Sequence, residues 1–152
     1  MLIRPANPSD AAGMVRVIEE IFATGLRKTT GDADWVLEHY INHKDRIECS
    51  LAVTDEGRIL GFQSLRYAVA DNPYGVAEGW GIIGTHVSPQ AARQGVGKAL
   101  FSATLKAAKS FGLKNIDATI GDTNETGLAY YEAMGFRRYR TIDAAICKVY
   151  SV

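Results

Sequence analysis

The chain has 152 residues, of which 47% are hydrophobic, and its 17 lysines and arginines balance 17 aspartates and glutamates. This length and apolar content predict a single folded domain over residues 1–152 with a hydrophobic core of its own. A formal net charge of zero lacks the general basic field of a nucleic-acid-binding protein, so we expect no nucleic-acid partner.

The first residues and the cysteines indicate where the protein works. Met1 to Pro5 contains no long apolar stretch, so we expect no signal peptide, and no segment approaches the length of a membrane span. Cys49 and Cys147 do not suggest a disulfide framework, and we interpret them as reduced, partly buried thiols. These features favour a cytoplasmic protein without a membrane partner.

The first third of the chain predicts a strand followed by two helices. Met1–Arg4 is short and apolar enough for a strand, and Asn7-Pro8-Ser9-Asp10 contains residues that cap and begin helices. Gly25 is expected to end the first helix, and Trp35–His43 reads as a second one. The helical spacing of the first is carried by Ala11, Met14, Val15, Ile18 and Phe22.

His39 and His43 lie four residues apart in the second predicted helix, so they would share one of its faces. The zinc motif of metalloproteases needs a glutamate directly after the first histidine. Tyr40 stands there instead, and no third ligand is evident. We therefore expect solvated or core-edge histidines and no metal.

Three runs in the middle of the chain predict strands, over Glu48–Val53, Arg58–Tyr67 and Trp80–Val87. Asp55-Glu56-Gly57 between the first two is a hairpin signal. The third run is rich in glycine, which weakens a strand and often marks a bulge or a close approach of the backbone. Packing alone is the other reading of these glycines, which are Gly79, Gly81 and Gly84.

The last third alternates helix and strand. An apolar helical stripe runs from Val96 to Phe111, with Gly112 placed to cap its end. The further elements predicted by periodicity are a strand over Lys114–Ile120, a helix over Asn124–Met134 stopped by Gly135, and strands over Arg137–Thr141 and Ala144–Tyr150.

The segment Val87–Leu100 joins a predicted strand to a predicted helix. Gly95 and Gly97 within it let the backbone come close to a ligand. The first amides of the helix have no partner inside it, and they lie at the positive end of its dipole. Such an end binds anions such as phosphate, and Arg93 and Lys98 would add full charges beside it.

Two phosphate-loop motifs fit this segment poorly. A nucleotide-hydrolase loop needs a glycine where Ala92 stands and a hydroxyl where Ala99 stands. A dinucleotide loop could take Asp117 as its acidic residue, but Leu100 replaces its third glycine. We interpret Asp117 as structural. A helix start whose glycines serve only the turn is the simplest alternative.

The segment does resemble the pyrophosphate loop of the GNAT superfamily of acetyl-CoA-dependent N-acetyltransferases, in the run Arg93-Gln94-Gly95-Val96-Gly97-Lys98-Ala99-Leu100. A second motif of that family is similar to Asn124 followed by Ala129-Tyr130-Tyr131-Glu132-Ala133-Met134-Gly135-Phe136. Two motifs in the family's order and at its separation are far more specific than either alone. One departure is Ala92, where the family usually has Arg or Gln.

The resemblance implies an α/β (α+β) fold with a mixed, mostly antiparallel twisted sheet of about six to seven strands, flanked by about four helices. It implies acetyl-CoA as co-substrate, no metal, a small-molecule amine as acceptor, and a possible homodimer. In this family the strand before the loop bulges and splays from its neighbour, and the pantetheine arm of acetyl-CoA fills the gap. The region between the first two helices borders the acceptor site.

The resemblance also implies which residues bind acetyl-CoA. The loop amides from Gln94 to Ala99 would hold the pyrophosphate, and the backbone from Thr85 to Val87 would pair with the pantetheine arm. The full expected set is Thr85, His86, Val87, Arg93, Gln94, Gly95, Val96, Gly97, Lys98, Ala99, Asn124 and Tyr131.

Acyl transfer from a thioester needs a donor to the carbonyl oxygen, a base for the amine and an acid for the departing thiolate. The resemblance implies the Val87 amide as the donor and Tyr131 as the acid, since a phenol holds its proton at neutral pH and can still donate it. Tyr130 would point to another face of the helix.

The base is open at this stage. Relatives often use a glutamate on the strand before the loop, and the candidates here are Glu78 at the strand's beginning, His86 near its end, or a chain of water molecules. The alternative to an enzyme is a non-catalytic acyl-CoA-binding or sensing module of the same fold.

Overall fold

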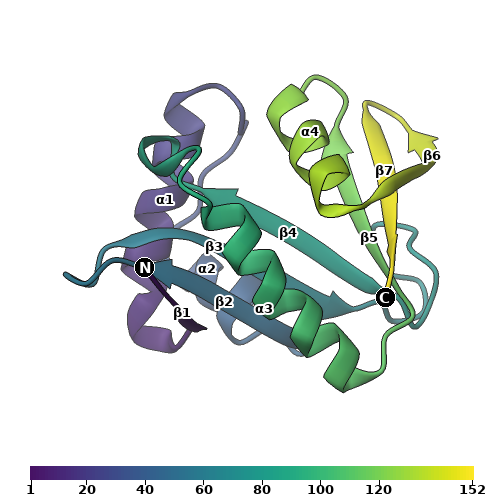
Figure 1. Ribbon diagram of the computed structural model, residues 1–152, viewed down its shortest axis with the longest axis horizontal. Coiled ribbons are helices and arrows are strands. Elements are labelled where there is room, and N and C mark those ends of the chain that lie inside the picture. The colour runs from purple at the N-terminus through teal and green to yellow at the C-terminus, as the bar shows by residue number, and fades with distance from the viewer.

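A computed structural model describes all 152 residues, and it contains one seven-stranded sheet in the order β1-β2-β3-β4-β5-β7-β6. Every neighbouring pair is antiparallel except β4 and β5, which are parallel. The predicted mixed, mostly antiparallel sheet is confirmed (Figure 1). The strands are β1 Leu2–Pro5, β2 Arg46–Val53, β3 Ile59–Tyr67, β4 Gly81–Val87, β5 Asn115–Gly121, β6 Arg137–Ile142 and β7 Ala145–Ser151.

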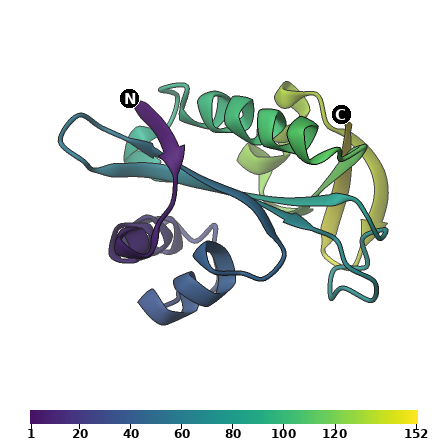
Figure 2. The same ribbon diagram turned by 90° about the horizontal axis from the view of Figure 1, so that it is seen from below.

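Four α-helices flank the sheet, namely α1 Ala11–Ala23, α2 Ala33–Val36, α3 Val96–Phe111 and α4 Glu125–Met134. Figure 2 shows α1 and α2 on one face of the sheet and α3 and α4 on the other. Each face buries its own apolar core. Phe62 faces the core under α1 and α2, and Leu65, three residues along the same strand, faces the core under α3 and α4.

The second helix differs from its expected form. It begins at Ala33, because Asp32 accepts a hydrogen bond from the Trp35 amide at 2.9 Å and caps it. It then widens into a π-helical turn over Leu37–Ile41 and ends before His43. The first helix ends at Ala23, and Gly25 follows it with a φ of +84°.

None of the helices of the chain is long and apolar enough to cross a membrane.

The expected bulge in β4 is absent. Its pairing with β3 runs without a register shift from Gly61 opposite Val87 to Tyr67 opposite Gly81. Tight packing explains the glycine at position 81 instead. A Cβ on Gly81 would lie 2.7 Å from Leu113 Cδ1 and 2.9 Å from Leu65 Cδ1, so a larger residue would not fit there.

The start of α1 is fixed by a buried carboxylate. Asp10 accepts two hydrogen bonds from Arg4, both at 2.8 Å, and a third from the Asn7 amide at 2.8 Å. The hydrogen bonds from Arg4 outweigh the desolvation of the carboxylate and lower the pKa of Asp10. This pair ties β1 to the turn, Pro8–Asp10, that leads into α1.

We predict that Asp10→Asn lowers the free energy of unfolding by about 2 kcal/mol at pH 7, since three bonds to a charged acceptor are weakened. The folded-state pKa lies below the unfolded one, so this stabilisation is complete above about pH 4 and is lost as the pH falls below it. The difference in the free energy of unfolding between wild type and Asp10→Asn, measured by urea unfolding, should therefore be smaller at pH 3 than at pH 7. Glu56→Gln, at an exposed turn residue without hydrogen bonds, is the control.

Candidate functional site

The sheet opens between β4 and β5. The two strands pair only at Gly81 with Ile116 and at Ile82 with Asp117, and no pairing continues beyond these positions. Figure 1 shows the strands diverging from that point toward the end of β4. The splay expected for this strand is therefore present, although the bulge is not.

The opening leaves one edge of β4 without partners. The Ser88 amide donates to the Leu60 carbonyl at 2.8 Å, so even-numbered amides of β4 point toward β3. The alternation of a strand then directs the amides of Thr85 and Val87 toward β5, where no strand meets them. The backbone of His86 points the other way, so it cannot pair with a molecule lying in the opening as expected.

The loop after β4 ends in a helix start with free amides. The first intrahelical bond of α3 runs from the Ala99 amide to the Gly95 carbonyl at 3.0 Å. The amides of Val96, Gly97 and Lys98 precede it and have no partner within the chain. Gly95 has a φ of +77°, in the left-handed region, and a Cβ there would meet nothing within 4 Å. The backbone conformation, not the lack of space, therefore favours glycine at this position.

Gly97 is required for a different reason. A Cβ there would lie 2.6 Å from Cε1 of Tyr130, and the Tyr130 hydroxyl donates to the Gly97 carbonyl at 2.7 Å. The same hydroxyl accepts a hydrogen bond from Gln63 Nε2 at 3.0 Å. Tyr130 therefore packs directly under the loop, a contact that its expected place on another face of the helix from Tyr131 did not reveal.

Tyr131 is buried, and its ring packs edge-on against Phe136. Its hydroxyl is hydrogen-bonded to Thr85 Oγ1 at 2.7 Å, and Thr85 Oγ1 in turn accepts from Gln63 Nε2 at 2.9 Å. Burial raises the pKa of Tyr131 above its usual value, so the phenol keeps its proton. A continuous hydrogen-bond network thus joins the Tyr131 hydroxyl to the loop.

Gln63 is the link that sequence reasoning missed. It is fully buried, and its Nε2 bonds both Thr85 and Tyr130 while its Oε1 has no partner. The available signal was a glutamine beside Phe62 in the middle of a strand whose residues are mostly buried. Such a residue is buried only where partners exist for it.

Two other expected site residues take no part in this hydrogen-bond network. Asn124 caps α4, and its Oδ1 accepts from the Gly127 amide at 3.0 Å. Glu78 is exposed in the loop before β4. Glu78 precedes Gly81, and the rise of the strand from Gly81 to Val87 at its other end is about 20 Å. Glu78 is therefore too far from Val87 to act as the base.

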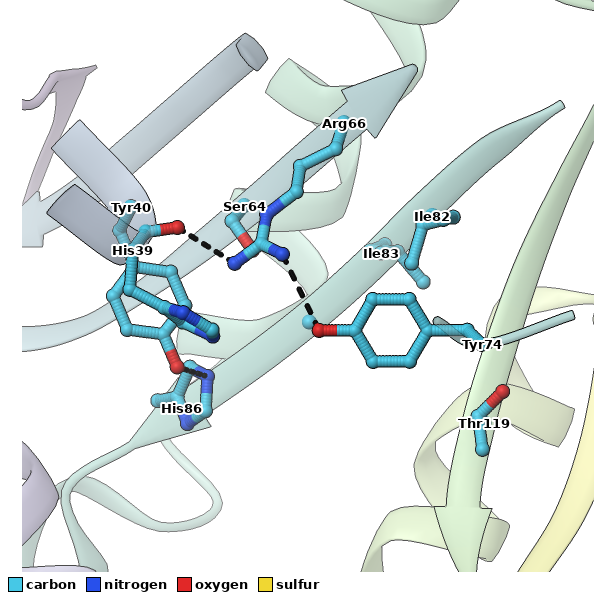
Figure 3. A pocket seen from close by; sticks show the side chains of 10 residues that line it. His39, Tyr40, Ser64, Arg66, Tyr74, Ile82, Ile83, His86 and Thr119 are labelled. Carbon is cyan, nitrogen blue, oxygen red and sulfur yellow. Dashed lines mark hydrogen bonds between the residues drawn. The ribbon is translucent and has the colours of Figure 1, made fainter. Parts of the chain in front are cut away.

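A cavity of about 150 Å³ lies on the α1 and α2 face of the opened strand (Figure 3). It is lined by His39, Tyr40, Ser64, Arg66, Tyr74, Ile82, Ile83, Gly84, His86 and Thr119. Since successive side chains of β4 alternate between faces, this cavity and the Tyr131 network occupy opposite sides of the same strand. No carboxylate lines it.

His86 occupies one wall of the cavity. Its ring stacks on Phe62 at a centroid distance of 4.6 Å, and its Nε2 lies 3.2 Å from the Tyr40 hydroxyl. Burial, aided by the charges of Arg27 and Arg66, lowers the pKa of His86 to about 3. The same causes lower the pKa of His39 to about 4. Both histidines are neutral and weakly basic at pH 7.

The remaining polar groups have structural explanations. Asp117 is buried and accepts hydrogen bonds from Thr119 and Tyr139, in keeping with the structural role expected for it. His39 stacks on Trp35 at a centroid distance of 4.4 Å. The structure contains no group of three or more His, Cys, Asp or Glu residues that could hold a metal ion.

Comparison with known proteins identifies the family. The model of the acetyltransferase (GNAT) family matches residues 15–136. The opened strand, the loop with free amides and Tyr131 all lie within the matched residues, and this match identifies the protein as an acyltransferase. The chain belongs to the acetyltransferase (GNAT) family.

Three relatives illustrate the similarity. The chain is 26% identical over 147 residues to phosphinothricin N-acetyltransferase from Streptomyces viridochromogenes, covering 94% of this chain and 78% of that protein. It is 33% identical over 91 residues to mycothiol acetyltransferase from Paenarthrobacter aurescens, covering 60% of this chain and only 28% of that protein. The fold is also that of a GNAT superfamily phosphinothricin acetyltransferase from Sinorhizobium meliloti, whose crystal structure was solved in complex with AcCoA. The two structures superpose with a TM-score of 0.80 at 17% sequence identity, and the match covers 99% of this chain and 88% of the other.

We predict that Gly97→Ala lowers the free energy of unfolding by about 1–3 kcal/mol, because the new methyl group overlaps the Tyr130 ring. Urea unfolding measures this loss. Gly121→Ala is the matched control, since nothing lies within 4 Å of a Cβ there. In a Tyr130→Leu background the cost of Gly97→Ala should fall, and an unchanged cost would contradict the packing argument.

Proposed function

We propose that this protein transfers the acetyl group of acetyl-CoA directly to the primary amine of a small molecule. The observation that carries the proposal is the unpaired edge of β4, which presents the amides of Thr85 and Val87 close to the buried Tyr131 hydroxyl. Family membership and the acetyl-CoA complex of a relative with the same fold support acetyl-CoA as co-substrate. The relatives named for phosphinothricin and mycothiol support a small-molecule acceptor.

The start of α3 fits the pyrophosphate of such a co-substrate. Three free amides at the positive end of a 16-residue helix form an anion site. The exposed side chains of Arg93, Gln94 and Lys98 lie on the same loop and could assist. Gly95 and Gly97 keep side chains away from these amides.

The residues around the opening supply two of the three chemical roles. Acetyl-CoA, when bound, supplies a thioester, and the Val87 amide would donate to its carbonyl oxygen as negative charge develops there. The amine nitrogen forms the new C–N bond, the C–S bond breaks, and Tyr131 would give its proton to the departing sulfur. The Thr85 hydroxyl can then donate to the Tyr131 oxygen, because Gln63 leaves that proton free.

The third role falls to solvent. The cavity has no carboxylate, and both of its histidines have a low pKa because burial disfavours their charged forms. The acceptor must therefore react as the free amine, without a strong protein base. The proton that its nitrogen releases once the C–N bond has formed would pass to water, and Tyr131 would regain a proton from water.

We expect Tyr131→Phe to lower kcat about 10²–10⁴-fold, the usual contribution of a general acid, while calorimetric affinity for acetyl-CoA changes little. Thiol release over a panel of small amines measures the rate. Tyr150→Phe is the control, since the Tyr150 hydroxyl makes no hydrogen bond and its ring packs on Phe136 in the same core. Full activity in Tyr131→Phe would remove the tyrosine from the mechanism. Acetyl-CoA binding without release on any amine would instead indicate the non-catalytic module.

The pH dependence tests the absence of a protein base. With pKa values of about 3 for His86 and about 4 for His39, both set mainly by burial, neither histidine of the cavity titrates between pH 6 and 9. Burial also raises the pKa of Tyr131, so the acid stays protonated over this range. We expect kcat/KM to rise with pH along the titration of the acceptor amine. Two amines of different pKa should give two different midpoints, whereas one shared midpoint near pH 7 would reveal a protein base.

A further inference from the structure

We propose that Arg66 binds an oxyanion of the acceptor, so that the substrates of this site are small amines that also carry a carboxylate or a similar acidic group. This inference rests on the proposed acetyl transfer and narrows its acceptor. It comes from the hydrogen bonds that hold the Arg66 side chain in the cavity and from the absence of any acidic residue in the cavity wall.

Arg66 is positioned as a rigid donor. Its Nη2 donates to the His39 carbonyl at 2.6 Å, and its Nη1 donates to the Tyr74 hydroxyl at 3.3 Å (Figure 3). Its guanidinium also lies 5.8 Å from the centroid of the Tyr40 ring. A guanidinium has five N–H donors in a planar fork, and these two hydrogen bonds leave the rest for a ligand.

The charge of Arg66 is not neutralised by the protein. Four of the half-buried arginines have a carboxylate at salt-bridge distance, namely Arg4, Arg16, Arg46 and Arg140. Arg27 and Arg66 are also half-buried and have none. Arg27 lies over the Trp35 ring, which stacks on His39 in the cavity wall. Arg66 thus lines the cavity, and Arg27 lies behind its wall, so two cations without a carboxylate partner act on the same space.

The titration of neighbouring groups agrees with a positive field in the cavity. After burial, the charges of Arg66 and Arg27 are among the causes that lower the pKa of His39 and of His86. The cavity wall contains no acidic residue that would oppose them. An oxyanion would satisfy this field, and arginine binds carboxylates through two parallel hydrogen bonds.

The position of Arg66 suits a molecule that reacts at its other end. Arg66 stands opposite Ile82 on β4, and Thr85 follows three residues later, about 10 Å along the strand. A compact molecule of amino-acid size can place its acidic group on the guanidinium and its amine toward the opening. The cavity volume of about 150 Å³ fits a molecule of that size better than a polypeptide segment.

The test compares amino acids with their uncharged carboxamides as acceptors, in wild type and in Arg66→Gln, by thiol release. We expect wild type to prefer the acid at least 10-fold in kcat/KM. Arg66→Gln should raise KM for the acid 10- to 100-fold, leave the carboxamide nearly unchanged, and leave calorimetric affinity for acetyl-CoA unchanged. Arg66→Lys, which keeps the charge without the fork, should retain part of the preference. Arg138→Gln, at an exposed arginine without a carboxylate partner, is the control.

An unchanged acid-to-carboxamide ratio in a folded Arg66→Gln would overturn this inference and leave acetyl transfer intact. If no amine causes release of thiol from acetyl-CoA, the proposed function fails. Calorimetric titration of the same amino acids into wild type and Arg66→Gln then tests the oxyanion site by itself. Binding lost in the variant supports the oxyanion site, and no binding to wild type overturns it. Thermal unfolding of each variant establishes that it is folded.

Discussion

The parallel contact between β4 and β5 sets the position of everything else in the site. Parallel neighbours cannot be joined by a hairpin, so a crossover is needed, and α3 provides it. Because α3 begins shortly after β4 ends, its free amides lie at the same end of the sheet as the unpaired edge of that strand. The pairing lasts for only two residue pairs, so the two strands run apart beyond Ile82. One constraint therefore brings together a polar backbone edge and an anion site.

A buried hydrogen-bond network then connects these two features. It runs from the Gly97 carbonyl through Tyr130, Gln63 and Thr85 to the Tyr131 hydroxyl. Burial raises the pKa of Tyr130 to about 12, so its hydroxyl remains a donor to the loop at any ordinary pH. In a low-dielectric interior such bonds are strong when satisfied and costly when broken. The loop and the tyrosine are consequently held in one fixed relation by residues from β3, β4 and α4.

The sequence allowed the elements and the loop to be predicted because their signals are local. Helical spacing, the hairpin turn and the glycines of Val87–Leu100 each act within a few residues, and the structure has the corresponding elements. The errors arose where tertiary contacts decide. Tyr130 could not be assigned from helix geometry alone, since its role depends on Gly97 and Gln63 from distant segments. Glu78 was a candidate because it precedes β4 in sequence, but an extended strand converts that short separation into a long distance. The π-helical turn that brings the His39 carbonyl to Arg66 has no sequence signal of its own.

If the cavity beside β4 takes the acceptor, as we propose, its charges have two effects. Burial and two unpaired arginines hold the pKa of His39 and of His86 low, which removes a base from the cavity. The same positive field disfavours an ammonium ion and therefore favours the uncharged amine, the form that can attack a thioester. An acidic group on the acceptor offsets the repulsion and anchors the molecule at the far end of the cavity. Under the proposed function, such a cavity would need no carboxylate near the reacting nitrogen, because it would select the uncharged form of the acceptor instead of creating that form by proton transfer.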